Sequence, residues 1–362
     1  MQATTNFAQL RAAGQSIWLD NLSRTLITSG ELQRIVSAGE ATGITTNPAI
    51  FRNAIANGDA YRTDLDRLKQ SGHDAERRYE QLAIGDVRAA CDILRPVFDA
   101  SRGDDGFVSL EVSPALAADV DGTVAAARRL KAAVARDNAL IKIPGTPEGA
   151  AAFEQCIAEG ISVNITLLFS LGQMNRIFDA YQSGLERLRA TGGDVSKVKA
   201  VASFFMSRID SLVDKRLDAI GTPDALALRG RAAVAIGKLA YQRYGEVFGT
   251  PRFAALRAAG ARPQYLLWAS TSTKNPAYPD LLYVEPLIGP ETINTVPDAT
   301  LAAFRDHGKV ASTIGEGAAD SRAAVDVLAR LGIDLETVGT QLQQEGLKQF
   351  EDAFAALLDS VK

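Results

Sequence analysis

A lysine inside a strongly apolar run is the residue that selects a reaction type. Lys142 lies in the run ALIKI, between Ile141 and Ile143 and directly before Pro144. Among apolar neighbours an amine loses much of the hydration that stabilises its charge, so we expect a partly neutral amine near neutral pH. A neutral amine attacks carbonyl carbons, and the Schiff base that results stabilises a carbanion on the adjacent carbon. The chemistry open to this lysine is therefore carbon–carbon bond cleavage or formation.

Two carboxylates that could move protons lie at the ends of other apolar runs. Glu111 stands in FVSLEV, and Asp20 closes SIWLD. Either one could act as a general acid or base beside the amine. The only histidines, His73 and His307, lie in polar segments, which removes the commonest general base and the commonest metal ligand. We therefore expect no metal and no cofactor.

Polar side chains alternate with apolar ones in several of these runs. Ser109 and Glu111 share one face of FVSLEV, and Asn164 and Thr166 share one face of ISVNITL. Parallel strands that are covered on both faces should be almost continuously apolar, and an unpaired buried polar group costs about 1 to 3 kcal/mol. A polar pocket at the carboxyl ends of the strands would explain all of these residues. Its expected members are Asp20, Asn47, Glu111, Lys142, Asn164, Thr166 and Ser203.

Eight candidate strands alternate with longer helical patterns along the chain. They cover residues 16–20, 43–46, 107–112, 139–143, 161–167, 199–204, 264–269 and 281–286. Such alternation is typical of repeated β–α units around a parallel sheet, and eight units favour a closed barrel over an open sheet. The predicted fold class is α/β, a single (β/α)8 TIM barrel with additional helices.

Helix signals separate the strands. Thr28 and Glu31 have the spacing of a capping box. Thr146 and Pro147 predict the start of another helix, which ends at Gly160. The connections near 53–106 and 209–263 are longer than a βα unit requires, so we expect helical insertions there and a helical C-terminal segment, all within one unit covering 1–362.

Composition excludes several classes of protein. The 39 Lys and Arg residues against 43 Asp and Glu residues give a net charge of −4, which argues against a nucleic-acid binder. Cys91 and Cys156 lie in apolar helical patterns, so we expect no disulfide framework and a cytoplasmic location. Residues 1–14 lack the features of a signal peptide, and no run approaches the roughly 18 apolar residues of a membrane span. The oligomeric state is left open.

Taken singly, each candidate residue has an ordinary structural explanation. Lys142 could reach solvent or pair with Glu111. Arg208 and Lys274 could be surface cations, and Asn47 could cap the helix that follows it. Only their joint occurrence favours an active site.

At these same segments the sequence resembles the transaldolase family, and in particular its longer bacterial branch. The resemblance covers nearly the whole chain, and motifs in this order are highly specific. They are WLDNLSR, GITTNPAIF, SLEVSP, LIKIPGT, NITLLFS, SFFMSR, LLWASTSTKNPAYPD and IGPETINTVPDATLAAFRDHG.

The resemblance implies a Schiff-base mechanism that transfers a three-carbon dihydroxyacetone unit between phosphosugars in the pentose phosphate pathway. The family's lysine nucleophile falls on Lys142. Its acid/base carboxylate, which works through a water held with a threonine, falls on Glu111 and Thr166. Its aspartate, which handles the proton of the hydroxyl at the bond that breaks, falls on Asp20.

The resemblance also implies a substrate-binding set. Asn47, Asn164 and Ser203 match positions that hold the sugar hydroxyls, and Arg208 matches a phosphate-binding arginine. The sequence departs from the family where SFFMSR replaces an SPF motif before a Gly-Arg pair, and where Lys274 stands for a second arginine. A lysine serves phosphate as a point charge without the bidentate fork of arginine.

Two other functions remain open at this point. A Schiff-base aldolase acting on fructose 6-phosphate or a related sugar would release a triose without needing an acceptor, because its enamine would be protonated instead of transferred. A barrel that binds phosphosugars without turnover would form no covalent adduct, and fold alone never proves activity.

Overall fold

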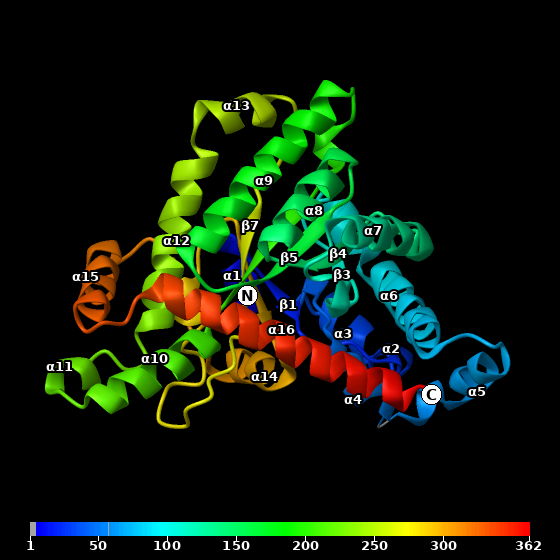
Figure 1. Ribbon diagram of the computed structural model, residues 1–362, viewed down its shortest axis with the longest axis horizontal. Coiled ribbons are helices and arrows are strands. Elements are labelled where there is room, and N and C mark those ends of the chain that lie inside the picture. Colours follow the sequence, from blue (N-terminus) through cyan, green and yellow to red (C-terminus); the bar gives the residue numbers. More distant parts are fainter. Residues whose placement is uncertain (1–4, 57) are drawn as a thin grey trace.

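Eight parallel strands form a closed barrel in the computed structural model, which describes residues 5–56 and 58–362. Their order around the barrel is the order of the sequence, and β1 closes the ring by pairing with β8. The fold class predicted from the sequence is therefore confirmed (Figure 1). The strands are β1 (Gln15–Leu19), β2 (Gly43–Ile44), β3 (Val108–Glu111), β4 (Ala139–Pro144), β5 (Val163–Leu168), β6 (Ala200–Phe205), β7 (Tyr265–Ala269) and β8 (Thr292–Val296).

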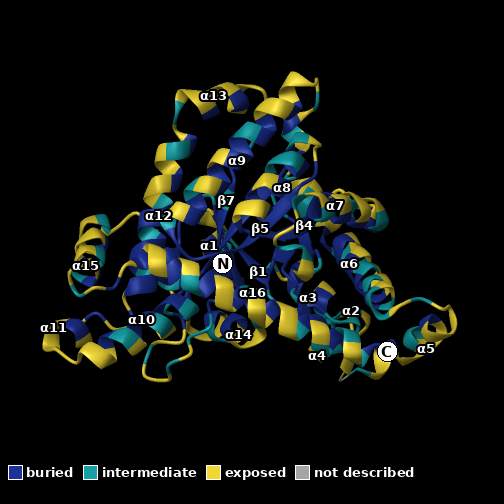
Figure 2. Ribbon diagram, in the orientation of Figure 1, coloured by how far each residue is buried: buried dark blue, intermediate teal, exposed yellow. Residues whose placement is uncertain are grey.

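Helices surround the barrel and bury their inner faces against it (Figure 2). None of those in the described part of the chain is long and apolar enough to span a bilayer. The helices are α1 (Asn6–Ala12), α2 (Arg24–Thr28), α3 (Glu31–Ser37), α4 (Pro48–Ala56), α5 (Arg62–Gln70), α6 (Ala75–Ala100), α7 (Val120–Val134), α8 (Pro147–Ala158), α9 (Leu171–Ala190), α10 (Ser207–Ile220), α11 (Pro223–Leu226), α12 (Ala232–Phe248), α13 (Pro251–Ala258), α14 (Asp298–His307), α15 (Ala318–Arg330) and α16 (Leu335–Ser360).

The long connections are helical, as expected. The segment near 53–106 contains the last part of α4 together with α5 and α6, and the segment near 209–263 contains nearly all of α10 together with α11 to α13. The first four residues and residue 57 lie outside the described part, so the structure is silent on the start of the segment 1–14 and on one position of the first insertion. The expected helical C-terminal segment is α16, which crosses in front of the barrel strands in Figure 1.

The eighth predicted strand is wrong. Residues 281–284 form turns, Glu285–Leu287 is a short 3-10 helix, and the strand that closes the barrel is β8. Most of the apolar residues of the predicted strand are buried, but they belong to a loop that packs against the core. Tyr283 illustrates this, because its hydroxyl donates to Asp210 of α10 and its carbonyl accepts from Asn294 of β8.

One predicted helix start is confirmed and another is wrong. The hydroxyl of Thr146 accepts from the backbone N–H of Gly149 at 2.8 Å, and α8 begins at Pro147. Thr28 instead ends α2, and its hydroxyl donates to the carbonyl of Arg24. Helix α3 has Gly30 at its N-cap, in the left-handed conformation, so no capping box forms with Glu31.

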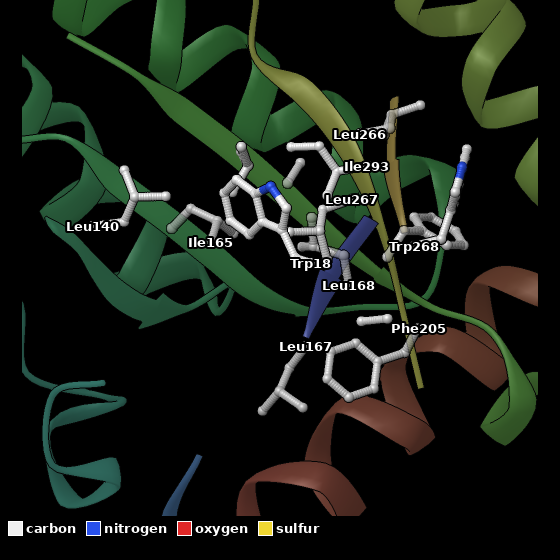
Figure 3. Close-up of a cluster of buried hydrophobic side chains, with 14 of the residues drawn as sticks. Trp18, Leu140, Ile165, Leu167, Leu168, Phe205, Leu266, Leu267, Trp268 and Ile293 are labelled. Carbon is white, nitrogen blue, oxygen red and sulfur yellow. The ribbon is translucent and has the colours of Figure 1, made fainter. Parts of the chain in front are cut away.

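Trp18 and Trp268 anchor the buried core of the barrel (Figure 3). The indole N–H of Trp18 donates to Asp105 at 2.8 Å, which fixes the ring beside β2. In the register of β1 and β2, Trp18 is the partner of Gly43, and a Cβ at that glycine would lie 2.5 Å from the ring. Glycine is therefore required where the tryptophan crosses the neighbouring strand.

Substitution of Gly43 by alanine is expected to lower the free energy of unfolding by about 1 to 3 kcal/mol, because the new methyl group overpacks the core. Gly245→Ala is the matched control, because Gly245 is exposed within α12 and a Cβ there meets nothing within 4 Å. That change should raise stability by about 0.5 to 1 kcal/mol through helix propensity. Urea unfolding of both variants tests the contrast, and equal stabilities would contradict it.

Candidate active site

The amine of Lys142 lies at the carboxyl end of β4, inside the barrel. The residue is only 4% exposed, and its Nζ donates to the carbonyl oxygen of Thr46 at 2.9 Å. Glu111 is its register partner on β3, and the Glu111 Oε2 atom lies 3.8 Å from Nζ. Neighbouring parallel strands thus place an amine and a carboxylate side by side, as the alternation of polar residues predicts.

The carboxyl group of Glu111 is held in a strongly perturbed environment. The residue is 7% exposed, and neither of its oxygens has a hydrogen-bond partner among the described residues. Burial raises the pKa of Glu111 to about 7, although the positive charge of Lys142 opposes that shift. Asp20 adds to the rise by repulsion. A carboxyl group that titrates near neutrality can both donate and accept protons under physiological conditions.

Asp20 follows β1 and faces the same end of the barrel. Its Oδ1 accepts from the hydroxyl of Thr45 at 2.7 Å, and that hydroxyl also lies 2.6 Å from the hydroxyl of Thr295. Burial raises the pKa of Asp20, while Lys142 and the Thr45 hydrogen bond counteract part of the rise. Sequence reasoning did not identify Thr45 or Thr295, because an isolated threonine in a strand carries no functional signal of its own.

A cavity of about 320 Å³ opens above these groups at the carboxyl ends of the strands. Seven of the nine candidate site residues line it, whereas Glu111 and Asn164 do not. The wall consists of Asp20, Thr45, Asn47, Ala49, Lys142, Thr166, Ser203, Phe205, Arg208, Ala269, Ser270, Thr271, Ser272, Lys274, Thr295, Pro297, Gln349, Phe350 and Ala353.

Asn164 and Ser203 form a hydrogen-bonded group inside the barrel. The Asn164 amide donates to Ser109 Oγ at 3.0 Å, and its oxygen accepts from Ser203 Oγ at 2.6 Å. The structure thus joins Asn164 to the cavity through Ser203. Thr166 reaches the cavity wall directly, and its buried hydroxyl has no hydrogen-bond partner among the described residues.

Asn47 combines a structural contact with a place on the cavity wall. Its Oδ1 accepts from the backbone N–H of Ile50 at 3.0 Å, as expected of a residue that caps α4. Asn47 therefore caps α4, as its ordinary structural explanation predicts, and also lines the cavity.

Two cations border the other side of the cavity. Arg208 lies in the first turn of α10, where its Nη1 is buried without a hydrogen-bond partner among the described residues and its guanidinium lies 5.4 Å from the ring centroid of Phe205. Burial lowers the pKa of Arg208 from its ordinary value. The exposed Lys274 follows β7, and its amine donates to Ser272 Oγ at 2.6 Å. An anion is the ligand that would satisfy both groups.

Helix α16 contributes part of the site that sequence reasoning missed. Gln349, Phe350 and Ala353 line the cavity, and the ring centroid of Phe350 lies 5.7 Å from the Lys142 amine. A signal for this was present in the sequence. Gly339, Gln343, Gly346 and Phe350 recur at helical spacing and are all buried.

No group of three or more His, Cys, Asp or Glu side chains that could hold a metal ion occurs within residues 5–56 and 58–362. His307 lies on the surface at the end of α14, where its ring contacts Asp280 and Asp306. The two cysteines are buried in α6 and α8 as free thiols. The polar groups that converge are instead those around Lys142.

The (β/α)8 barrel holds a buried lysine amine beside two carboxyl groups of raised pKa, and two cations border the same cavity. This arrangement is typical of the class of enzymes that carry out chemistry at a lysine. Residues 17–361 match the family described as Transaldolase/Fructose-6-phosphate aldolase, and the chain belongs to that family.

Relatives called transaldolase are similar to the chain over almost all of its length. The protein of Thiobacillus denitrificans is 55% identical over 96% of this chain and 97% of the relative. That of Neisseria gonorrhoeae is 50% identical over 98% of this chain and 99% of the relative. That of Mycolicibacterium smegmatis is 47% identical over 100% of this chain and 98% of the relative.

Proposed function

We propose that the chain is a transaldolase. It moves a dihydroxyacetone unit from sedoheptulose 7-phosphate to glyceraldehyde 3-phosphate, which gives erythrose 4-phosphate and fructose 6-phosphate. The observation that carries the proposal is the buried amine of Lys142, whose Nζ lies 3.8 Å from Oε2 of Glu111. The cavity that Lys142 lines also has Arg208 and Lys274 in its wall. This arrangement suits imine formation with a ketose that carries a phosphate at its other end.

The first half-reaction builds an imine on Lys142. The Lys142 ammonium passes a proton to Glu111, the neutral amine adds to the C2 carbonyl of the ketose, and Glu111 gives that proton to the carbonyl oxygen. Glu111 then takes a proton from the attached nitrogen and gives it to the new hydroxyl, so that water leaves and an iminium ion remains. Thr166, whose buried hydroxyl is unpaired among the described residues, is positioned to hold a water in this transfer. Asn47 and Ser203, which line the cavity, are assigned to the sugar hydroxyls, and Asn164 acts there through its hydrogen bond with Ser203.

The second half-reaction breaks the C3–C4 bond. Asp20 accepts the proton of the C4 hydroxyl, the aldehyde product leaves, and the bonding electron pair moves into the iminium to give an enamine. The raised pKa of Asp20 makes it a stronger base than an ordinary aspartate. Addition of the enamine to a new aldehyde and hydrolysis of the imine reverse these steps and free Lys142.

The test is incubation with fructose 6-phosphate and borohydride, with and without erythrose 4-phosphate. We expect covalent mass on the peptide that contains Lys142, and heptulose only when the acceptor is present. Absence of any label would contradict the Schiff base and leave a barrel that binds phosphosugars without turnover.

An aldolase that acts on fructose 6-phosphate is the second candidate, because the matched family includes such enzymes by its description. It would share the label on Lys142 but would release a triose without an acceptor. The acceptor dependence of product formation therefore separates the two candidates.

Arg208 and Lys274 should affect phosphorylated donors selectively. Arg208→Ala is expected to raise KM for fructose 6-phosphate by roughly 10- to 100-fold, the effect of losing a charge-assisted hydrogen bond to phosphate. Lys274→Ala should raise it by less than about tenfold, because this amine is exposed to solvent. Steady-state rates with unphosphorylated fructose are the control and should barely change. Equal losses with both donors would contradict the assignment.

Three further proposals concern the whole chain. Residues 1–362 would function as one barrel unit, with the insertions near 53–106 and 209–263 and helix α16 as parts of it. Its partners would be phosphosugars and not nucleic acid, given the net charge of −4. A cytoplasmic location would suit two buried thiols that form no disulfide.

A further inference from the structure

Helix α16 is fixed to the barrel at its N-terminal end. Its first turn carries Glu336, whose carboxylate accepts from the Ser170 hydroxyl at 2.7 Å and from the backbone N–H of Gly172 at 3.0 Å, at the start of α9. Gln173 of α9 also donates to the carbonyl of Gly339 at 3.1 Å. These contacts hold the first part of α16 independently of the residues nearer the cavity.

A second attachment lies in the middle of the helix. The amide nitrogen of Gln343, a buried side chain, donates to the carbonyl of Gly145 at 2.9 Å and to that of Leu167 at 3.0 Å. Gly145 follows β4, three positions after Lys142, and Leu167 follows Thr166 in β5. One side chain of α16 thus binds the ends of the two strands that carry an amine and a hydroxyl of the site.

The end of β5 is shaped to receive this contact. Leu167 has a φ of 60°, in the left-handed region that a leucine rarely adopts, and the pairing of β5 with β6 shifts register between Ile165 and Leu168. A Cβ at Gly346 of α16 would lie 3.0 Å from the side chain of Leu167, so the helix approaches the bulge closely. Figure 3 shows Leu167 beside Phe205 at one edge of the buried cluster.

The part of α16 that follows Gln343 covers the reactive amine. Phe350 lies seven positions further along, about two helical turns, and its ring faces the Lys142 amine with the centroid 5.7 Å away. Beyond Phe350 the helix has further contacts, because the Phe354 ring lies 5.6 Å from that of Tyr79 and Arg78 donates to the carbonyls of Val361 and Lys362. Loss of the Gln343 hydrogen bonds would therefore release only the middle of α16 from the ends of β4 and β5, while Glu336 and these contacts hold its two ends. The Phe350 ring would then lose the attachment that fixes it over Lys142.

We propose that Gln343 is a positioning residue that sets how the enamine divides between transfer and premature protonation. By fixing α16 to the ends of β4 and β5, it keeps the Phe350 ring over Lys142 and so keeps water away from the enamine. The inference rests on the proposed Schiff-base mechanism. It adds to that mechanism the structural element that makes the enzyme a transferase rather than an aldolase.

Premature protonation consumes the enamine without an acceptor. The terminal carbon of the enamine takes a proton from water, its electron pair forms the new C–H bond, and an iminium ion results. Hydroxide from the same water adds to the iminium carbon, the C–N bond then breaks, and the proton of the hydroxyl passes to the amine. The products are free dihydroxyacetone and Lys142, and one water is consumed. No bond to an acceptor aldehyde forms.

The experiment compares Gln343→Leu with Gln344→Leu. Gln344 is the neighbouring residue of the same type, but it is exposed. For each full-length protein we would measure dihydroxyacetone released from fructose 6-phosphate without acceptor, heptulose formed with erythrose 4-phosphate, and borohydride label on Lys142. The ratio of release to transfer should rise about 5- to 30-fold in Gln343→Leu, the change in an opening equilibrium expected when two buried hydrogen bonds are lost. It should stay at the unsubstituted value in Gln344→Leu.

Phe350→Ala is the second test, because it removes the covering ring and leaves the Gln343 contacts in place. It should raise the same ratio. An unchanged ratio in either Phe350→Ala or a folded Gln343→Leu variant would overturn the inference. If the unsubstituted protein labels no lysine, the proposed function fails instead, so the two failures give different results.

Discussion

Lys142→Ala is expected to lose transfer activity by roughly 10⁴- to 10⁶-fold, the loss that follows removal of a covalent nucleophile. The amine lies in the barrel beside Glu111 and under Phe350, and no other buried amine lines the described part of the cavity wall. Lys274 reaches that wall, but it is exposed and bound to Ser272. It therefore has neither the carboxylate partner nor the apolar surroundings that favour a nucleophilic amine.

The measurement pairs turnover with intact mass after borohydride reduction. Lys199→Arg is the matched control, because Lys199 is also buried but binds Asp104 at 2.7 Å and follows the 3-10 helix Val195–Lys197, at the start of β6. Arginine retains the cation that Asp104 requires, so this variant should still label and turn over. A Lys142→Ala protein that gained mass on another lysine and kept its activity would exclude Lys142 as the nucleophile.

Glu111→Gln is expected to lower kcat by about 10²- to 10⁴-fold, the usual contribution of a general acid–base group. It should also change the pH profile. The Lys142 ammonium can pass its proton to Glu111 only while that carboxyl group is ionised, and the pKa of Glu111 is about 7. The kcat/KM of the unsubstituted enzyme should therefore fall as the pH drops below about 7, because Glu111 is then protonated and cannot accept the proton of Lys142.

Glutamine cannot accept that proton, so the acid limb near pH 7 should disappear in Glu111→Gln. Glu148→Gln provides the control, because Glu148 is an exposed carboxylate in the first turn of α8. Its profile should match that of the unsubstituted enzyme. An acid limb that persisted in Glu111→Gln would assign the titration to a different group, with Asp20 as the next to be substituted.

Strands and their polar faces could be predicted because both depend on local spacing. The runs around Glu111 and Lys142 form β3 and β4 almost to the residue, and the register pairs the two side chains directly. The predicted strand at 281–286 failed for a physical reason. Its apolar residues serve a buried loop, whereas β8 contains the polar residues Thr292, Asn294 and Thr295 and so lacks an apolar pattern.

The cover of the site could not be predicted, because it depends on where a distant helix docks. The C-terminal segment was expected to be helical, but a helical pattern does not specify the surface that it contacts. Gln343 binds carbonyls 176 and 198 positions earlier in the chain. Every residue has a backbone carbonyl, so the sequence does not show which ones accept a hydrogen bond from a distant side chain. The same limit applies to Asn164, whose type suggested a ligand and whose bonds go to Ser109 and Ser203.

The way the barrel closes bears on the order in which it folds. β1 pairs with β8, and the Thr45–Thr295 contact that borders Asp20 joins residues 250 positions apart. Contacts between such distant segments form slowly, because a long loop must close before they contribute. The Asp20 side of the site should thus be completed late in refolding, after the neighbouring strands β3 to β6 have paired. Borohydride trapping during refolding would then report the final stage of folding, well after helix content has recovered.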